Sequence, residues 1–220
     1  MPEVTVSPFI ATGGEVDVAA WKGPGDEPPG EISAEAAVGW WEDGLYVYID
    51  VTDPFRFPAP EDTDTWCGAG VEIYIDDSGE FENPPDYDDP GTRQFVMVAP
   101  ESDDEPASRG EVFSSDGRLG DWDGTFAAQP RDGGYIAEAI VSAGDLGLEN
   151  WPLAGGQRVG LNLAINVSTE DGSPPDDDPC DGGVRLGQYF HRVDPDDDSS
   201  CGGHPYCNVR AFCTPTLAEP

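Results

Sequence analysis

The amino-acid sequence predicts an all-β protein, a β-sandwich of the jelly-roll or immunoglobulin-like kind with two antiparallel sheets and long acidic loops. Short runs of the sequence alternate apolar and polar side chains with a period of two, which is typical of strands that bury one face. Gly and Pro contribute 28 and 22 of the 220 residues and separate these runs. Helical periodicity is almost absent, so many short strands joined by turns are expected.

The clearest strand is LYVYIDV at 45–51, which places Leu45, Val47 and Ile49 on the face opposite to its tyrosines. A second strand, VEIYID at 71–76, ends in the turn sequence DDSG. Further strands are expected at 93–98, 110–113, 125–129, 135–141, 158–167, 185–192 and 208–212. Helix is expected only for one or two turns at 16–21 and at 142–146, because Pro and Gly interrupt every longer window.

The chain length suits one sandwich around one core, so residues 1–220 are predicted to form a single domain. Acidic loops such as PESDDEPASRG at 100–110 are interpreted as insertions, because strands continue on both sides of them. Residues 170–220 form an acidic, Cys-containing C-terminal segment.

The charge balance is extreme, with 45 Asp and Glu against 10 Lys and Arg and a net charge of −35. Such a chain repels phosphate backbones and anionic membrane surfaces, so nucleic acid is not an expected partner. The sequence contains no apolar stretch of the roughly 20 residues that a membrane span needs, so membrane insertion is not expected. The acidic excess indicates either a calcium-rich or saline environment or an adaptation for solubility, and both interpretations stay open.

Five cysteines indicate disulfide bonds and therefore an oxidising compartment, which predicts a secreted, extracellular or cell-surface protein. Four of them, Cys180, Cys201, Cys207 and Cys213, lie in the C-terminal segment and allow three pairings. Cys67 is then left over, either free or competing for a partner.

Five segments appear in an order and spacing that resemble the family 9 carbohydrate-binding modules and the related DOMON-like domains. They are GGEVDVAAW (13–21), WEDGLYVYIDVTDP (41–54), TWCGAGVEIYIDD (65–77), GGYIAEAIVSAGDLGL (133–148) and GQRVGLNLAINV (156–167). The resemblance implies a β-sandwich that binds the end of a sugar chain between two aromatic side chains, with polar groups and structural calcium nearby. It also implies that the protein is not an enzyme.

Carried over by position, the resemblance makes Trp66 a clamp aromatic and Glu72 a sugar-binding carboxylate. An indole offers a flat apolar platform to a pyranose, and a carboxylate accepts charge-assisted hydrogen bonds from hydroxyl groups. The alternative is that Trp66 packs at a rim and Glu72 is a surface charge on a strand.

The resemblance further implies that Arg93 pairs with Glu72 and donates to a sugar oxygen, and that Asn166 supplies a polar group. It places the second clamp aromatic in the C-terminal region, where Tyr206 or Tyr189 would have to serve. The sequence departs from the family at two positions that should carry amide side chains, which are Ala164 and Val98.

The other tryptophans have no assigned ligand. Trp21, Trp40 and Trp41 lie in or beside matched segments and are interpreted as core or sheet packing. Trp122 and Trp151 lie beside turns, where exposure is expected.

A metal site is predicted in DPDDDSS, which places Asp194, Asp196 and Asp198 at alternating positions, as loops that bind Ca²⁺ do. The segment lacks the later glycine and bidentate glutamate of an EF-hand, so a solvated acidic loop is the alternative.

The predicted function is non-catalytic binding of a polysaccharide or glycan, in a domain attached to a larger secreted enzyme or surface protein. One alternative is a haem-binding DOMON-like electron-transfer domain with Met97 as an axial ligand, which a Soret band would reveal. Another is a calcium-stabilised surface or adhesion domain, indicated by a calcium-dependent melting temperature without glycan binding. Catalysis has little support, because His191 and His204 follow no nucleophile motif.

Overall fold

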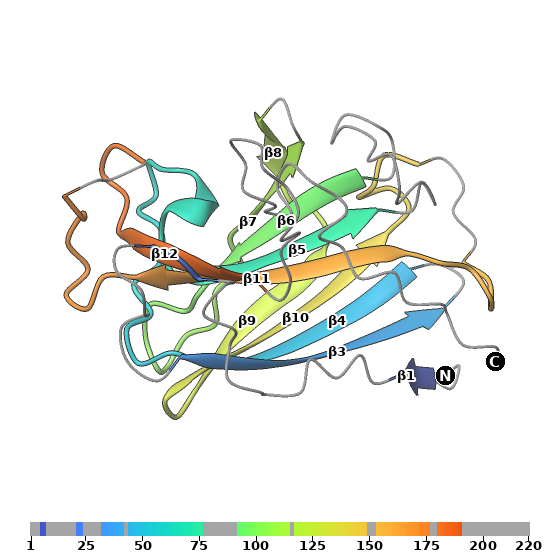
Figure 1. The fold of residues 1–220 in the computed structure, drawn as a ribbon, viewed down its shortest axis with the longest axis horizontal. Coiled ribbons are helices and arrows are strands. Elements are labelled where there is room, and N and C mark those ends of the chain that lie inside the picture. Colours follow the sequence, from blue (N-terminus) through green and yellow to red (C-terminus); the bar gives the residue numbers. More distant parts are fainter. Residues whose placement is uncertain are drawn as a thin grey trace.

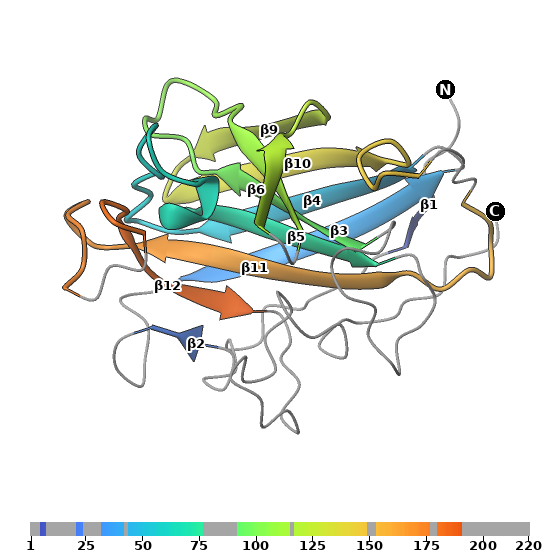
Figure 2. The ribbon, with the colours of Figure 1, turned by 90° about the horizontal axis from the view of Figure 1, so that it is seen from above.

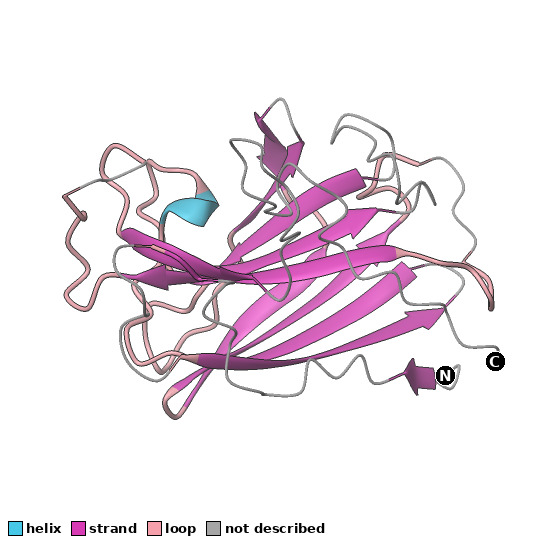
Figure 3. Ribbon diagram, viewed as in Figure 1, coloured by secondary structure: helices cyan, strands magenta, loops and turns pink. Residues whose placement is uncertain are grey.

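The structure, a computed structural model, describes residues 5–7, 21–23, 32–41, 44–76, 92–114, 117–148, 153–176 and 180–190. Two antiparallel sheets pack face to face (Figure 1). In the described residues the helical structure is a single 3-10 turn, η2 (Thr65–Cys67), drawn in cyan in Figure 3. The predicted all-β sandwich is confirmed.

The smaller sheet has five strands in the order β1-β3-β4-β10-β9. These strands are β1 (Thr5–Ser7), β3 (Ser33–Trp41), β4 (Gly44–Thr52), β10 (Gly134–Ser142) and β9 (Thr125–Arg131). The larger sheet has seven strands in the order β2-β12-β11-β5-β6-β7-β8, and Figure 2 shows β2 at its edge beyond β12. These strands are β2 (Trp21–Lys22), β12 (Arg185–Phe190), β11 (Gly160–Ser168), β5 (Gly70–Asp76), β6 (Thr92–Val98), β7 (Gly110–Ser114) and β8 (Gly117–Asp121).

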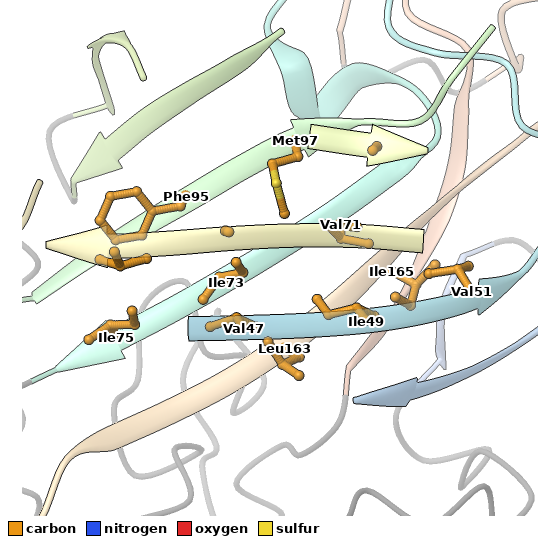
Figure 4. Packing of buried hydrophobic residues seen from close by; sticks show 14 of the residues in the cluster. Val47, Ile49, Val51, Val71, Ile73, Ile75, Phe95, Met97, Leu163 and Ile165 are labelled. Carbon is orange, nitrogen blue, oxygen red and sulfur yellow. The ribbon is translucent and has the colours of Figure 1, made fainter. Parts of the chain in front are cut away.

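The hydrophobic core lies between the two sheets and is built from alternate residues of their strands. Figure 4 shows these side chains from β4, β5, β6 and β11 meeting in the interior; they are Val47, Ile49, Val51, Val71, Ile73, Ile75, Phe95, Met97, Leu163 and Ile165. The period of two that the sequence shows in LYVYIDV and VEIYID is therefore the period of the core.

The outward face of β5 positions the candidate site. Because Val71, Ile73 and Ile75 face the core, Glu72 and Tyr74 face away from it. In the flanking strands, Gln94 of β6 stands opposite Tyr74, and Ala164 of β11 stands opposite Glu72. Every residue of β5 and β11 is buried, so this outward face is a polar layer shielded from water.

Most predicted strands are confirmed, with boundaries shifted by at most two residues. The strands β1, β3 and β8 were not predicted, and the segment 208–212 lies outside the described residues. The helix predicted at 142–146 is wrong, because a turn follows β10 there. The Asp145 carboxylate accepts hydrogen bonds from the backbone N and the hydroxyl of Ser142, both at 2.7 Å, and closes that turn locally. The helix predicted at 16–21 does not include Trp21, which lies in β2; residues 16–20 lie outside the described part.

A disulfide bond joins Cys67 to Cys180, with 5.8 Å between their Cα atoms. Cys67 is therefore not a left-over cysteine, and it ties the start of the C-terminal segment to η2. Gly183 permits this close approach, because a Cβ there would lie 2.8 Å from the Cys67 carbonyl oxygen. The remaining cysteines, Cys201, Cys207 and Cys213, lie outside the described residues.

Candidate functional site

A hollow of about 320 Å³ lies over the outward face of the larger sheet. Six elements, β2, η2, β5, β6, β7 and β12, contribute side chains to it. The lining residues are Lys22, Trp66, Glu72, Tyr74, Gln94, Phe113, Ser114, Arg185 and Gln188. Its volume falls at the lower end of the range that small-molecule sites occupy, about 300 to 1,000 Å³.

Trp66 lies in η2, and its backbone is fixed from several directions. The backbone N of Thr65 donates to Glu111 Oε2 at 2.7 Å, and the N of Cys67 donates to the carbonyl of Asp64 at 3.0 Å. The Cys67–Cys180 disulfide anchors the same turn. The indole is half-buried and packs against a small cluster that contains Cys67, so it is held in place before any ligand arrives.

The guanidinium of Arg185 lies over the Trp66 ring, with its Cζ atom 4.4 Å from the ring centroid. This is a cation–π contact, in which the negative face of the indole attracts the cation. The indole face on the Arg185 side is therefore already covered by a positive group.

Glu72 is completely buried at the floor of the hollow, and four neutral groups donate hydrogen bonds to its carboxylate. The Tyr74 hydroxyl and Gln94 Nε2, the latter at 2.9 Å, donate to Oε2. Asn166 Nδ2 at 2.8 Å and Gln188 Nε2 at 2.9 Å donate to Oε1. A carboxylate has about four acceptor positions, so protein donors occupy all of those of Glu72.

The Glu72 network fixes how the neighbouring amides are turned. Because a carboxylate can only accept, Gln94 and Gln188 must point their NH₂ groups toward it. Gln188 Nε2 also donates to Asn166 Oδ1 at 2.8 Å, which links the two amides on neighbouring strands. The carbonyl oxygens of Gln94 and Gln188 are thereby directed away from Glu72, as oriented acceptors in a pocket that both residues line.

The structure brings three of the five predicted sugar-site residues together. Trp66 and Glu72 line the same hollow, and Asn166 is bonded to Glu72 beneath it. Their role as saccharide ligands stays a prediction at this point. Tyr206 lies outside the described residues.

The predicted pairing of Arg93 with Glu72 is wrong. Arg93 shares the core-facing side of β6 with Phe95 and Met97, whereas Glu72 faces outward. Its guanidinium donates to the carbonyl of Thr92 at 2.6 Å and lies close to Gly147. The prediction missed the register of β6 by one residue. The neighbouring Gln94, whose side chain lies on the outward face, is the residue of β6 that reaches Glu72.

The second aromatic of the hollow comes from an unexpected strand. Tyr189 cannot serve as a clamp, because it belongs to the core between the sheets, with its ring 4.9 Å from that of Trp21, and does not line the hollow. Phe113 of β7 supplies an apolar wall instead. Trp122, for which exposure was expected, is buried and stacks on Phe126, with ring centroids 4.5 Å apart.

Sequence reasoning also missed Gln188, Lys22 and Arg185 as lining residues. Strand alternation placed Tyr74 on the same face as Glu72 but gave no signal that its hydroxyl would bind the carboxylate. Amide and basic residues on strands belong to no motif, so only the pairing of the strands reveals them.

The remaining predictions concern metals and haem. Asp194, Asp196 and Asp198 lie outside the described residues, so the calcium site stays a prediction. The described part of the chain contains no cluster of three or more His, Cys, Asp or Glu side chains suited to a metal ion. Met97 is 1% exposed and packs between the sheets as an ordinary core residue (Figure 4).

Among the described residues, no helix has the length and apolar character of a membrane span.

A family model described as carbohydrate family 9 binding domain-like matches residues 18–176. A family 9 carbohydrate-binding module from Caldicellulosiruptor kristjanssonii in complex with cellotriose has a similar structure, with a TM-score of 0.60 and 18% identity over 97% of this chain and 91% of that chain. A family 9 module from the same organism in complex with glucose gives a TM-score of 0.57 and 16% identity over 91% and 84%. No curated protein sequence matches the chain. At these identities the likeness to the solved structures shows the fold.

Proposed function

Because the chain belongs to the family 9 carbohydrate-binding modules, which bind saccharides and catalyse no reaction, we propose that a saccharide binds in the hollow over Trp66 and Glu72. The observation that carries this proposal is the meeting of a half-buried indole with a hydrogen-bonded amide network in one pocket. Two similar modules hold cellotriose and glucose, which supports a small saccharide or a chain end as the ligand.

The chemistry of the lining matches that of a sugar ring, which has apolar C–H faces and a polar rim of hydroxyls. Trp66 and Phe113 offer apolar surface to a face of the ring. Gln94 and Gln188 offer oriented carbonyl oxygens to the hydroxyls. Glu72 holds those amides in place and does not itself accept from the sugar, because its acceptor positions are filled.

The saccharide partner and the disulfide together favour a secreted or cell-surface protein. A bond between Cys67 and Cys180 persists in oxidising compartments, and modules of this family are typically extracellular. A free Cys67 thiol in protein isolated from its natural source would contradict this location.

The proposal is tested by calorimetric titration of the Trp66→Ala variant with glucose and cellotriose. Loss of the platform should weaken binding at least about tenfold, since burial and stacking of an aromatic ring are worth more than about 1.4 kcal/mol. The matched control is Phe57→Ala, which removes an exposed ring outside the hollow and should leave affinity unchanged.

Trp66→Phe keeps a smaller ring and should retain part of the affinity, which guards against a folding defect in Trp66→Ala. Equal affinities for the wild type and a folded Trp66→Ala protein would place the binding site elsewhere.

A further inference from the structure

We propose that the Cys67–Cys180 disulfide positions the saccharide site, so that the affinity for the saccharide depends on the redox state of this bond. The inference rests on the proposed function of the hollow and adds a mode of regulation to it. It is carried by the place of the disulfide, which joins the elements that hold Trp66 and Arg185.

The disulfide links two walls of the hollow. Cys67 directly follows Trp66 in η2, and Cys180 begins the short loop that leads into β12 at Arg185. The turn η2 and the start of β12 lie at the same end of the sandwich (Figure 1 and Figure 2). Since both elements contribute lining residues, the bond between them fixes how the two walls stand to each other.

Two further contacts cross the boundary between η2 and residues 180–185, which we call the seam. The backbone N of Val184 donates to the carbonyl of Cys67 at 2.7 Å, and the Arg185 guanidinium lies 4.4 Å from the centroid of the Trp66 ring. On the η2 side, Cys67 is 2% exposed and belongs to a small apolar cluster. The disulfide therefore ties the loop before β12 to a part of the chain that is firmly packed.

The conformation of the loop between the disulfide and β12 depends on both of its ends being held. The loop has no regular secondary structure, and Asp181 and Gly182 have φ angles of 50° and 110°, in the left-handed region. At the end of the loop, Val184 donates to Cys67, and its carbonyl accepts from the backbone N of Thr169 at 2.9 Å. Segments of this kind open at a low cost in free energy, so cleavage of the disulfide should loosen the loop before the sheets.

Gly183 shows how closely the seam is packed. A Cβ at this position would lie 2.5 Å from the Cβ of Cys180 and 2.9 Å from the Cβ of Cys67. Non-bonded carbon atoms normally lie about 3.5 to 4.0 Å apart, so even a methyl group forces the seam to move. Substitution of Gly183 therefore perturbs the seam without a change to either sulfur atom.

A dithiol can open the bond, and the attack is expected at Cys180, which is partly buried, whereas Cys67 is 2% exposed. A thiolate of the dithiol attacks Cys180 Sγ, the S–S bond breaks, and Cys67 leaves as a thiolate that takes up a proton. The second thiol then attacks the reductant sulfur of the mixed disulfide, which releases Cys180 as a thiol and closes the reductant into a cyclic disulfide. Two electrons and two protons thus pass from the dithiol to the two cysteines.

The first test is a calorimetric titration of the full chain with cellotriose, before and after treatment with dithiothreitol. The temperature is set below the onset of unfolding of the reduced chain, because a bond with a sequence separation of 113 also stabilises the whole fold. We expect reduction to weaken binding about tenfold, since the saccharide must then order the Trp66 side chain and the loop. Reoxidation should restore the affinity.

The second test uses the reciprocity of coupled equilibria, because a saccharide that prefers the oxidised chain must protect the disulfide in turn. A tenfold preference lowers the reduction potential of the bond by about 30 mV at saturating cellotriose. Alkylation of Cys67 along a redox titration, with and without cellotriose, measures this shift. A disulfide that only stabilised the fold would show the same potential in both series.

Variants assign the effect to this bond. The double variant Cys67→Ala/Cys180→Ala should bind cellotriose as weakly as the reduced wild type and should not respond to dithiothreitol. Gly183→Ala should weaken binding with both cysteines in place. Its matched control is Gly144→Ala in the turn after β10, where the new Cβ would lie at an ordinary distance of 3.6 Å from Ser142 Oγ and should leave affinity unchanged.

The possible failures are distinguishable. Equal affinities of the oxidised and the folded reduced chain, or tight binding by the double variant, would overturn the redox inference and leave the proposed function standing. If the reduced chain unfolds at every temperature, Gly183→Ala decides, and an unchanged affinity of that variant would overturn the inference. Absence of saccharide binding by the oxidised wild type would overturn the proposed function itself.

Discussion

Two of the three fully buried carboxylates among the described residues, Glu72 and Asp53, lie in different parts of the sandwich and have opposite hydrogen-bond environments. Glu72, on the outward face of the larger sheet, accepts four hydrogen bonds from protein groups. Asp53 follows directly after β4. Its Oδ1 accepts from the backbone N of Phe55 at 2.8 Å, and its Oδ2 has no hydrogen-bond partner.

The difference shows in the electrostatics at Asp53. Burial raises the pKa of the Asp53 carboxyl, while the hydrogen bond from Phe55 and the positive charge of Arg56 lower it by less. The same carboxylate lies near two buried tyrosines, Tyr135 and Tyr189, whose hydroxyls also have no hydrogen-bond partner. Burial, with a contribution from Asp53, raises the pKa of Tyr189 to about 12.

A buried carboxylate is therefore tolerated here in two ways. Around Glu72 the fold supplies enough donors to replace water, and the charge becomes the organising centre of a site. Around Asp53 the donors are too few, and the charge is a cost to stability. In a chain with so many acidic residues, the supply of donors decides whether a buried carboxylate anchors a hydrogen-bond network or lowers stability.

The largest expected effect on stability comes from disrupting the hydrogen-bond network of Glu72. Glu72→Gln should lower the free energy of unfolding by about 3 kcal/mol, because an amide cannot accept on both sides and leaves buried donors unpaired. The same change should weaken saccharide binding by releasing Gln94 and Gln188 from their fixed orientation. Chemical denaturation and calorimetric titration measure the two effects.

Glu138→Gln provides the matched control for this change. Glu138 lies half-buried on the smaller sheet and accepts a hydrogen bond from the Tyr46 hydroxyl, so its replacement should cost less than about 1 kcal/mol and leave binding unaltered. If the two variants proved equally stable, the Glu72 network would not have the organising role given to it.

A smaller effect of opposite sign is expected at Asp53. Since its pKa is raised in the folded protein, the folded state holds this proton more tightly than the unfolded chain does. The corresponding stability is fully present below the ordinary carboxyl pKa of about 3.9 and is lost as pH rises through the raised value. Asp53→Asn should remove this loss and raise the free energy of unfolding at pH 7 by about 1 kcal/mol.

The measurement for Asp53→Asn is a series of denaturation curves between pH 3 and pH 8. Asp50→Asn is the control, because Asp50 is partly exposed and paired with Arg131 at 2.5 Å, and its loss should be slightly destabilising. If Asp53→Asn instead lowered the free energy of unfolding at pH 7, the Asp53 carboxylate would have a stabilising partner, and the account of it as a cost to stability would be wrong.

The strands were predictable where alternate residues face the core and therefore give the sequence an apolar-polar period of two. The alternation in 45–51 and 71–76 reappears as the inward faces of β4 and β5. The strand β3 was missed because its sequence, SAEAAVGWW, is rich in alanine, which has little strand propensity. The hairpin strand β8, GRLGD, has a single large apolar residue, and it is exposed.

The candidate site was predictable only in part. The spacing of Trp66 and Glu72 along the chain led to two side chains of one hollow. Gln94 and Gln188 could not be found in this way, because they meet Glu72 through pairing between strands far apart in sequence. A shift of one residue in register exchanges Gln94 for Arg93, and the alternation of a single strand does not fix which residues of its neighbours share the site.

The central claim, that a saccharide lies against Trp66, is tested most directly by the indole N–H signals in a ¹H–¹⁵N NMR titration with glucose and cellotriose. The Trp66 signal is assigned by its absence in Trp66→Phe, and Trp122, whose indole N donates to Asp145 at 2.9 Å in the core, is an internal reference. The account predicts a saturable shift of the Trp66 signal with the Trp122 signal unchanged. Saturable shifts of other tryptophan signals, with Trp66 unmoved, would contradict it.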